Sequence, residues 1–555
     1  MSNGVQHVFV LMLENRSFDH MLGFSDITGI DASSGATTQV NGLNPLALRP
    51  LLQVYQVNSV SRTVLMKGLM WGPPSQPYSV RELLASNVFN GQSYAPIEGA
   101  DYAMPVDPGH EFPDVLVQLS GPGAVYPSGG EYPPTVNTGF VASYAGSVGF
   151  DAQLQIILGA SNPGEIMKCY SPSQLPVLNA LAQEFVVCDN WHASMPGPTW
   201  PNRFFVHAAS SGGLDHSPSS FDIGKWSSLD GFDFQNGTIF DRLNNEGINW
   251  RIYAGDDFPV VMALHGINFT DITDYEDFAE DVSQPDYSAS YTFIEPDYGH
   301  LTSDFKCGTS QHPLDDVTRG ERLIKATYES LRASPIWGQS LLIVTWDEHG
   351  GFYDHLPPPA AVAPGDTAPG SDYNQYGFTF QQYGPRIAAI VISPLISRNL
   401  IDHGLYDHAS IPATIEKCFG LSPMTQRDAN AANLMTLIAQ STPRGNTPTT
   451  LPAPAQSGVT GCDPVAFDRR GATTPVVQPT VLPVTRPQDS MNEGNLPGFL
   501  FVVLRSELAI SPPEQRAGIL ARFGTIKTRQ DAANYVSEVT PKVRGARTAL
   551  PGKQP

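Results

Sequence analysis

Positive charge is scarce in this chain of 555 residues, which has 32 Lys and Arg against 54 Asp and Glu. The formal net charge of −22 argues against a nucleic-acid partner, because a phosphate backbone would meet a repelling surface. Long apolar runs are missing as well, and no stretch reaches the roughly 18 residues of a membrane-spanning helix. The sequence therefore predicts a protein that has no transmembrane segment and binds no nucleic acid.

Cysteine is sparse too, and the five cysteines form no Cys-x-x-Cys pair. Their spacing matches neither a zinc cage nor a disulfide framework, and an odd number leaves at least one free thiol. This favours a reducing compartment, although one disulfide stays open. The residues MSNGVQ stand directly before the apolar run HVFVLML and lack the basic region of a signal peptide. We therefore expect a soluble protein that is cytoplasmic or exported by a non-classical route.

The apolar residues that are present come in short runs. With 41% hydrophobic and 15% charged residues, the composition is that of an ordinary globular protein. Short continuous runs favour buried parallel strands, and they occur at VFVLML (8–13), LQIILG (154–159), FVVCDN (185–190), LLIVTWD (341–347) and IAAIVIS (387–393). Residues 315–334 have one apolar face and predict a helix. The alternation predicts a doubly wound α/β fold with a mostly parallel sheet.

The composition changes near residue 440. Residues 441–495 are rich in Pro, Thr, Gln and Ser, which indicates a linker along the surface, whereas residues 496–555 regain helical patterns. Nine Lys and Arg against four Asp and Glu give residues 501–555 a net charge of +5. We predict a main domain over 1–440, a Pro-rich linker and a basic helical C-terminal segment. This segment either docks on the acidic domain or lies on an anionic membrane, and the long linker favours docking.

Polar side chains follow two of the predicted strands. Glu14 and Asn15 come directly after VFVLML, and Asp347 and Glu348 come directly after LLIVTW. Open α/β sheets bind ligands beyond the carboxyl ends of their strands, so these oxygens indicate one shared metal site. Oxygen ligands favour Ca²⁺, Mg²⁺ or Mn²⁺, and Zn²⁺ is also compatible. The structural alternatives are a helix cap at the first pair and a solvated turn at the second.

A hydroxyl nucleophile is suggested by the stretch GPTWPNR. Thr199 follows a loop rich in Gly and Pro and stands just before a predicted helix. At a helix N-terminus a phosphoryl group is stabilised by unpaired N–H groups and by the helix dipole. A nearby metal ion could lower the pKa of the hydroxyl for attack. The alternative is that Thr199 only caps the helix, since Thr is a preferred capping residue.

Two histidines in polar loops complete the candidate site. His110 lies in VDPGHEF and His312 in SQHPLDDV, and neither stands on an apolar face. Phosphoryl transfer needs donors for the equatorial oxygens and a proton source for the leaving group, and histidine provides both. The alternative is that both are merely exposed loop residues. His355 in GGFYDH gives a weaker signal of the same kind.

Four motifs together resemble those of the phosphoesterase family, within the alkaline phosphatase superfamily. The motifs are ENRSFDHMLG, GPTWPNR, HP-x-x-DV-x-x-GE and TWDEHGGFYDH, and they occur in the family's order and with similar spacing over residues 6–420. The family contains phospholipases C that cleave phosphatidylcholine, plant non-specific phospholipases C and acid phosphatases of the A type. The resemblance implies an alkaline-phosphatase-like α/β/α sandwich, a phosphoesterase domain over residues 1–440 and a covalent phospho-enzyme intermediate.

The resemblance also implies a role for each residue that matches a motif. The implied metal ligands are Glu14, Asn15, Asp347, Glu348 and Thr199. The implied catalytic residues are Thr199 as nucleophile, with His110 and His312 as phosphate-binding or acid–base groups. Substrate binding is assigned to Asn202 of GPTWPNR and to His355.

Three functions are compatible with these residues. The leading one is a metal-dependent phospholipase C, which hydrolyses a phospholipid phosphodiester through a phosphothreonine. The second is a broad-specificity acid phosphatase that acts on small phosphomonoesters. The third is a non-catalytic, metal-stabilised binding module, which needs the same metal ion but no reactive threonine. No G-x-S-x-G motif occurs, so the chemistry of Ser/His/Asp hydrolases is unsupported.

Overall fold

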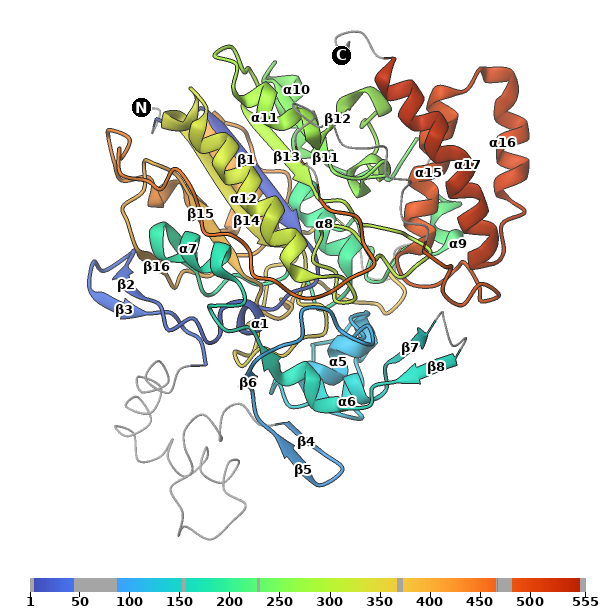
Figure 1. The fold of residues 1–555 in the computed structure, drawn as a ribbon, viewed down its shortest axis with the longest axis horizontal. Helices are drawn as coiled ribbons and strands as arrows, with labels where there is room; N and C mark the ends of the chain where they lie inside the picture. Colours follow the sequence, from blue (N-terminus) through green and yellow to red (C-terminus); the bar gives the residue numbers. More distant parts are fainter. Residues whose placement is uncertain are drawn as a thin grey trace.

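A ten-stranded sheet forms the centre of the computed structural model (Figure 1). The structure describes residues 4–43, 87–151, 156–226, 230–366, 373–465, 467 and 482–549. The strands of the sheet are β1 (His7–Leu13), β2 (Thr28–Asp31), β3 (Thr37–Gln39), β10 (Val186–Cys188), β11 (Trp250–Ala254), β12 (Ile272–Asp274), β13 (Tyr291–Glu295), β14 (Ser340–Trp346), β15 (Ala389–Ile392) and β16 (Leu400–Asp402). Their order in space is β12-β11-β13-β1-β14-β15-β10-β16-β2-β3.

Most neighbouring strands of this sheet are parallel. Six of the nine pairs run in the same direction, including β1 with both β13 and β14. Every residue of β1 and β14 is buried, as expected for continuous apolar runs with helices on both faces. The α/β fold with a mostly parallel sheet is therefore confirmed.

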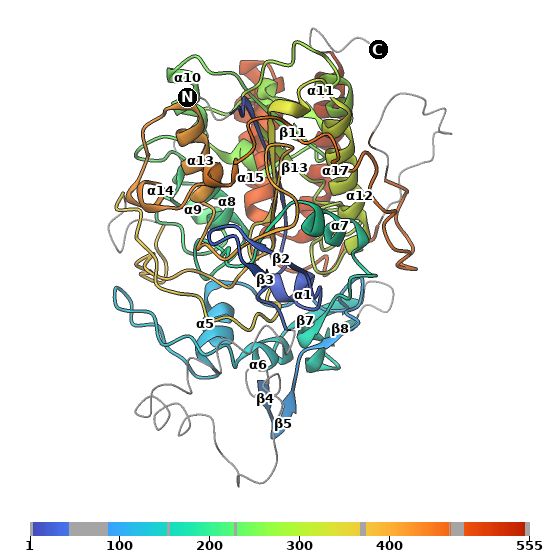
Figure 2. The same ribbon diagram turned by 90° about the vertical axis from the view of Figure 1, so that its left-hand side faces the viewer.

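Helices cover both faces of the sheet (Figure 2). One face carries α7 (Pro176–Glu184), α11 (Phe278–Val282) and α12 (Val317–Ala333), and the other carries α8 (Thr199–Ala208), α10 (Ile239–Asn245) and α13 (Ser410–Phe419). Shorter helices are α1 (Phe18–Leu22), α9 (Ser220–Ile223) and α14 (Gln426–Asn430). The helix predicted for residues 315–334 corresponds to α12, and its predicted apolar face is buried.

A smaller group of elements lies below the sheet in Figure 1, next to the carboxyl ends of its central strands. It consists of β4 (Asn87–Phe89), β5 (Gln92–Tyr94), β6 (Ile97–Glu98), α5 (Phe112–Ser120), α6 (Phe140–Ala145), β7 (Val148–Asp151), β8 (Ile156–Gly159) and β9 (Lys168–Cys169). The helices α5 and α6 share a hydrophobic cluster that includes Val115, Phe140 and Phe352. They form one wall around the ends of the central strands.

Two of the predicted strands differ from the expectation. Of the run LQIILG, residues 156–159 form β8, which pairs with β7 in a two-stranded hairpin outside the central sheet. Residues 154–155 lie outside the described ranges. A central position for this run is therefore wrong. The run IAAIVIS contains β15, which is antiparallel to both its neighbours. A short apolar run does not specify which sheet it joins or its direction, because its periodicity is the same in each case.

The C-terminal segment folds into α15 (Leu496–Ile510), α16 (Arg516–Phe523) and α17 (Arg529–Thr548), drawn in red in Figure 1. The apolar side chains at the start of α15, such as Phe499 and Leu500, belong to the same hydrophobic core as the sheet. Docking of this segment on the main domain, the favoured alternative, is confirmed. Among the helices of the described ranges, none has both the length and the hydropathy to span a bilayer.

The described parts of the predicted linker lie along the main domain. The carbonyl of Pro448 accepts a hydrogen bond from the hydroxyl of Tyr328, 2.6 Å away. Cys462 forms a disulfide with Cys307, across 155 residues of sequence. The sequence left one such pair open, and Cys169, Cys188 and Cys418 take no part in this disulfide. Residue 466 and residues 468–481 of the linker lie outside the described ranges.

Candidate active site

The two predicted pairs of metal ligands meet at the carboxyl ends of β1 and β14. The backbone N–H of Asn15 donates to Asp347 Oδ1 over 2.9 Å, and the N–H of Glu348 donates to the same oxygen over 2.7 Å. Asn15 has a φ of 59°, in the left-handed region that asparagine tolerates better than most residues. Glu14, Asn15, Asp347 and Glu348 are all buried. The residues that follow β1 and those that follow β14 therefore lie together in the interior of the protein.

Among the residues that the structure describes, three side-chain oxygens at this junction have no hydrogen-bond donor. They are Glu14 Oε2, Asn15 Oδ1 and Glu348 Oε1, and each is shielded from solvent. A buried oxygen without a donor destabilises a fold unless a cation or an ordered water contacts it. Carboxylate and amide oxygens are the ligands that hard divalent cations prefer. The donor set therefore fits a divalent metal ion, and it fits neither a helix cap nor a solvated turn.

The protonation of these carboxyl groups reflects their shared burial. Burial, with a further contribution from Asp347, raises the pKa of Glu14 to about 8. Burial also raises the pKa of Asp347 to about 6, although Arg203 opposes this shift. A bound cation would act in the opposite direction, because its positive charge stabilises the ionised form of each carboxyl group. The site is therefore destabilised without a cation and suited to binding one.

Arg203 connects the helix that carries Thr199 to both strand ends. Its Nε donates to Asp347 Oδ2 over 2.9 Å, and its Nη2 donates to the carbonyl of Leu13 over 2.9 Å. All three groups are buried. Thr199 lies four residues earlier on α8, on the same face and about 6 Å along the axis. This geometry directs the first turn of α8 towards the carboxylates.

Thr199 is the first residue of α8 and is not its cap. Pro198 occupies the cap position, and no side chain makes a capping hydrogen bond there. Thr199 is fully buried, and its hydroxyl is 3.4 Å from Asn495 Nδ2. The capping alternative for Thr199 is therefore not what the structure shows. Its role as nucleophile stays a prediction.

Asn202 shapes the loop before Thr199. Its amide nitrogen donates to the carbonyls of Gly197 and Pro198, at 2.9 and 3.0 Å, and its amide oxygen accepts from the N–H of Met195 over 3.1 Å. These bonds hold the Gly- and Pro-rich loop against the first turn of α8. The substrate-binding role predicted for Asn202 stays a prediction, and the contacts that the structure gives it are with this loop.

The two predicted histidines lie near this junction, and their pKa values are shifted in opposite directions. His110 Nε2 is 3.4 Å from Asn15 Nδ2. Burial alone would lower the pKa of His110, but the charges of Glu348 and Asp107 raise it to about 10. Burial, with the positive charges of His110 and Arg16, holds the pKa of His312 well below its ordinary value. Without a bound cation, the pKa of one imidazole is thus raised and that of the other is lowered.

Asp107 links the two histidines. Its Oδ2 is 3.6 Å from His312 Nε2, and its charge raises the pKa of His110. Burial raises the pKa of Asp107 itself to about 7. The other ring nitrogen of His312, Nδ1, is buried and has no hydrogen-bond partner within the described part of the chain. This nitrogen is available to a group bound in the site.

His355 belongs to a separate buried cluster. Its Nδ1 is 2.7 Å from Asp19 Oδ2, and together with Asp354 these residues offer ligand atoms within 4.8 Å of one another. The guanidinium of Arg386 already supplies positive charge there, with hydrogen bonds of 2.9 Å to Asp354 and 3.0 Å to Asp19. A cation would therefore compete with Arg386 at this cluster. The predicted contact between His355 and the substrate stays a prediction.

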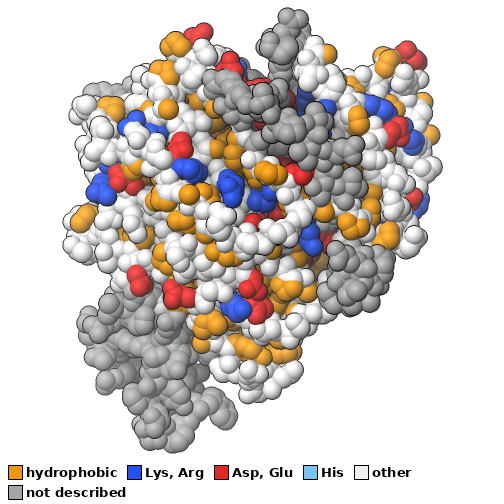
Figure 3. Space-filling model, in the orientation of Figure 1, with side chains coloured by type: hydrophobic (Ala, Val, Ile, Leu, Met, Phe, Trp, Pro, Cys, Tyr) orange, Lys and Arg blue, Asp and Glu red, His pale blue; other side chains and the backbone are white. Residues whose placement is uncertain are grey.

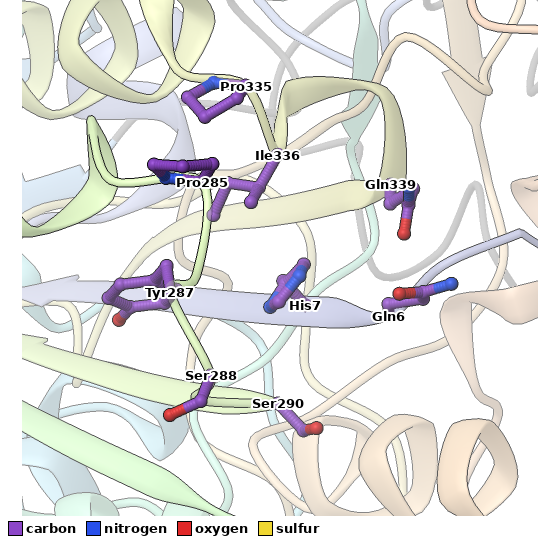
Figure 4. A pocket seen from close by; sticks show the side chains of 9 residues that line it. All are labelled: Gln6, His7, Pro285, Tyr287, Ser288, Ser290, Pro335, Ile336 and Gln339. Carbon is purple, nitrogen blue, oxygen red and sulfur yellow. The ribbon is translucent and has the colours of Figure 1, made fainter.

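A surface hollow of about 430 Å³ lies at the opposite end of β1 (Figure 4). Gln6 and His7 line it, and β1 then runs about 20 Å before Glu14 is reached. Figure 4 shows proline, serine and glutamine side chains around the hollow and no carboxylate. It therefore lacks the chemistry of the junction.

On the face shown in Figure 3, Lys and Arg are interspersed with Asp and Glu and form no broad basic surface.

Three residues of this neighbourhood were not singled out in the sequence. Arg203 stands in the motif GPTWPNR, four residues after Thr199. On a helix this spacing places both residues on the same face, and it could have identified Arg203 from the sequence. Asp107 stands three residues before His110 in the same loop. Asn495 lies 296 residues from Thr199, and no local pattern signals their contact.

Known proteins resemble this chain over most of its length. The model of the Phosphoesterase family matches residues 5–422. Non-specific phospholipase C3 of Arabidopsis thaliana is 31% identical over 466 residues, which cover 81% of this chain and 76% of the relative. Non-specific phospholipase C6 of the same plant is 31% identical over 469 residues, with 81% and 75% covered. Phospholipase C A of Mycobacterium tuberculosis is 24% identical over 450 residues, with 75% and 73% covered.

Solved structures give a weaker likeness. A protein of the alkaline phosphatase superfamily from Vibrio parahaemolyticus has a TM-score of 0.28 and 16% identity, over 48% of this chain and 63% of its own, less than two thirds. The phosphonate monoester hydrolase of Agrobacterium radiobacter has a TM-score of 0.29 and 11% identity, over 50% and 74%. At these scores the likeness carries no argument about function. The sequence matches do: this chain belongs to the Phosphoesterase family, which implies use of a divalent metal ion, and it is a phosphoric ester hydrolase.

Proposed function

We propose that this enzyme is a phospholipase C that hydrolyses phospholipid phosphodiesters through a phosphothreonine at Thr199. The observation that carries the proposal is the position of Arg203, which joins the helix of Thr199 to Asp347 and to the end of β1. Through Arg203, the helix that begins at Thr199 is tied to the junction, where the described residues provide no donor for Glu14 Oε2, Asn15 Oδ1 and Glu348 Oε1. The relatives named as phospholipases C support a phospholipid as substrate.

The divalent cation is proposed to be bound by the carboxylates and the amide at the junction, with the Thr199 hydroxyl as a further ligand. The protein ligands would be Glu14, Asn15, Asp347 and Glu348. Their hard oxygens favour Ca²⁺, Mg²⁺ or Mn²⁺. When bound, the cation would supply positive charge that lowers the pKa of the hydroxyl and neutralises the phosphoryl oxygens.

The reaction proceeds in two displacements at phosphorus. Thr199 Oγ forms a bond to phosphorus, the bond to the diacylglycerol oxygen breaks, and that oxygen takes up a proton. Water then attacks the phosphothreonine, releases the phosphorylated head group and returns a proton to the threonine. With its raised pKa, His110 suits binding of the phosphoryl oxygens and donation of a proton to the leaving group, whereas the low pKa of His312 suits hydrogen bonding to a bound group.

The test compares phosphatidylcholine in detergent micelles with p-nitrophenyl phosphate. We expect faster hydrolysis of the diester, complete loss of activity in excess chelator and recovery with a divalent cation. Thr199→Ala should lower kcat by about 10³-fold or more, because covalent catalysis has no substitute nucleophile, whereas Thr199→Ser should retain part of the activity. Thr238→Ala is the matched control, since Thr238 caps α10 and removing it costs stability of about 1 kcal/mol but no catalytic group.

Each contrary result identifies a different error. Turnover of more than a few per cent in Thr199→Ala would show that another residue is the nucleophile. A preference for the aryl phosphate would favour the acid phosphatase. A metal-loaded protein that hydrolyses neither substrate would favour the binding module. Full activity in chelator, with no metal found by elemental analysis, would remove the metal from the mechanism.

A further inference from the structure

The C-terminal segment reaches the proposed nucleophile. Asn495 immediately precedes α15, and its Nδ2 donates a hydrogen bond to Thr199 Oγ1 over 3.4 Å. Thr199 is fully buried and Asn495 is only 7% exposed. Within the ranges that the structure describes, no other side chain hydrogen-bonds this hydroxyl. Asn495 lies outside residues 5–422, which the family model covers.

The amide of Asn495 lies between two hydroxyl groups. Its oxygen accepts a hydrogen bond from the hydroxyl of Ser217 over 3.2 Å, and its nitrogen faces the hydroxyl of Thr199. The N–H of Ser217 in turn donates to Glu111 Oε2 over 3.2 Å, next to His110 in the sequence. In this arrangement the loop around Ser217 holds the amide beside Thr199, with the amide nitrogen as the donor. A donor leaves the hydroxyl proton free to be removed.

Asn495 is not used to cap its own helix. Asparagine is among the preferred capping residues, yet the Asn495 side chain makes no capping hydrogen bond to α15. Other residues of α15 hold the helix in place. The ring centroid of Phe499 lies 5.6 Å from that of Trp200 and 5.0 Å from that of Tyr298. Gly498 lies so close to the Trp200 indole that a Cβ would be 2.3 Å from it. The side chain is thus positioned by a buried helix.

We propose that Asn495 is a further active-site residue, which orients the Thr199 hydroxyl and stabilises its oxygen as the hydroxyl proton is removed. This inference rests on the proposed function, because it takes Thr199 as the nucleophile. A donor that faces a developing oxyanion in a buried site acts in the transition state more than in the ground state. The C-terminal segment then contributes directly to the active site.

The experiment measures kcat and KM with a soluble diester, p-nitrophenyl phosphorylcholine, on the metal-loaded full-length enzyme. Asn495→Ala should lower kcat by about 10- to 100-fold with little change in KM or in the melting temperature. Loss of an oxyanion donor costs about 10²–10³-fold, and the 3.4 Å contact is long for such a donor. Asn492→Ala is the matched control, because exposed Asn492 contacts the N–H of Ser220 and not Thr199. It should behave like the wild type.

Two conservative variants distinguish a role of Asn495 as hydrogen-bond donor from a role in packing. Asn495→Asp has nearly the same shape but cannot donate when ionised, whereas Asn495→Gln keeps the donor and is one methylene longer. We expect Gln to retain more kcat than Asp, and a role in packing alone predicts the reverse. If Asn495→Ala does not fold, the Asp and Gln variants carry the test.

The outcomes distinguish this inference from the function beneath it. If Thr199→Ala is inactive while Asn495→Ala matches Asn492→Ala, the role of Asn495 is disproved and the proposed function stands. If Asn495→Asp exceeds Asn495→Gln in kcat, donation to Thr199 is disproved as well. If the wild type hydrolyses no phosphoester, the proposed function fails and this inference fails with it.

Discussion

The side chain of His216 connects loops next to the candidate active site through ion pairs. His216 contacts Asp215 Oδ1 at 3.1 Å and Asp222 Oδ2 at 3.0 Å, and it directly precedes Ser217, which orients Asn495. Asp215 also accepts backbone hydrogen bonds from Gln375 and Tyr376. The cationic form of His216 therefore joins two segments beside the active site. Its protonation should influence stability.

The stability contributed by His216 should depend on pH. Burial alone would lower the pKa of His216, but hydrogen bonds to Asp215 and Asp222 raise it to about 9. A raised histidine pKa stabilises the fold fully below its unfolded value near 6.5, and the contribution is lost as the pH rises through about 9. His216→Gln should therefore lower the unfolding free energy by roughly 2 kcal/mol near pH 6, allowing for partial exposure.

Denaturant unfolding at several pH values measures this effect. The difference between wild type and His216→Gln should vanish above about pH 9.5, where both proteins lack the charge. The control is His265→Gln, since His265 is 52% exposed and 3.9 Å from Asp233. A deficit in His216→Gln that is constant across the pH range would show that packing, and not charge, is responsible.

The elements that the sequence predicted best are those whose pattern is local. β1, β14 and α12 follow from continuous apolar runs and from one helical apolar face, and residues directly after β1 and β14 then mark the candidate site. Direction and partner are not local properties, which is why β15 and the β7–β8 hairpin differed from the expectation. The contact of Asn495 with Thr199 depends on how a distant helix packs, so no spacing in the sequence could predict it.

Packing between α15 and α8 depends on the absence of a side chain at Gly498. A Cβ there would lie 2.3 Å from Trp200 Cζ2, so Gly498→Ala must displace the helix or the indole. Overpacking of this kind costs about 1–3 kcal/mol, and displacement of α15 also moves Asn495 away from Thr199. We expect Gly498→Ala to lower both the melting temperature and kcat.

The comparison variant is Gly518→Ala in α16, where nothing lies within 4 Å of the added Cβ. Because alanine favours a helix over glycine by about 1 kcal/mol, this variant should be neutral or slightly more stable. Thermal unfolding and kcat of the two variants decide the matter. Equal melting temperatures and equal kcat for both would show that the close approach at Trp200 is easily relieved.

Attraction between the basic C-terminal segment and the acidic main domain contributes little to the stability of the whole molecule. Arg544 is 2.8 Å from Asp257, and Arg529 is 2.8 Å from Asp304. Ion pairs that are partly exposed contribute about 0–1 kcal/mol each. By contrast, each fully buried Phe or Leu contributes about 1.5–3 kcal/mol, and Phe499, Leu500 and Phe501 of α15 are all fully buried. Apolar burial therefore exceeds charge attraction.

Truncation near residue 490 tests this conclusion for the whole chain. The lost burial is comparable to the 5–15 kcal/mol or so that stabilises a typical domain, so the truncated protein should melt at lower temperature or aggregate. Its binding to anionic vesicles should equal that of the full chain, because the net charge of −22 repels an anionic surface and the apolar side of α15 faces the core. Thermal unfolding and vesicle co-sedimentation measure the two properties. A truncated enzyme that is as stable as the full chain but no longer binds vesicles would show instead that the segment serves the membrane.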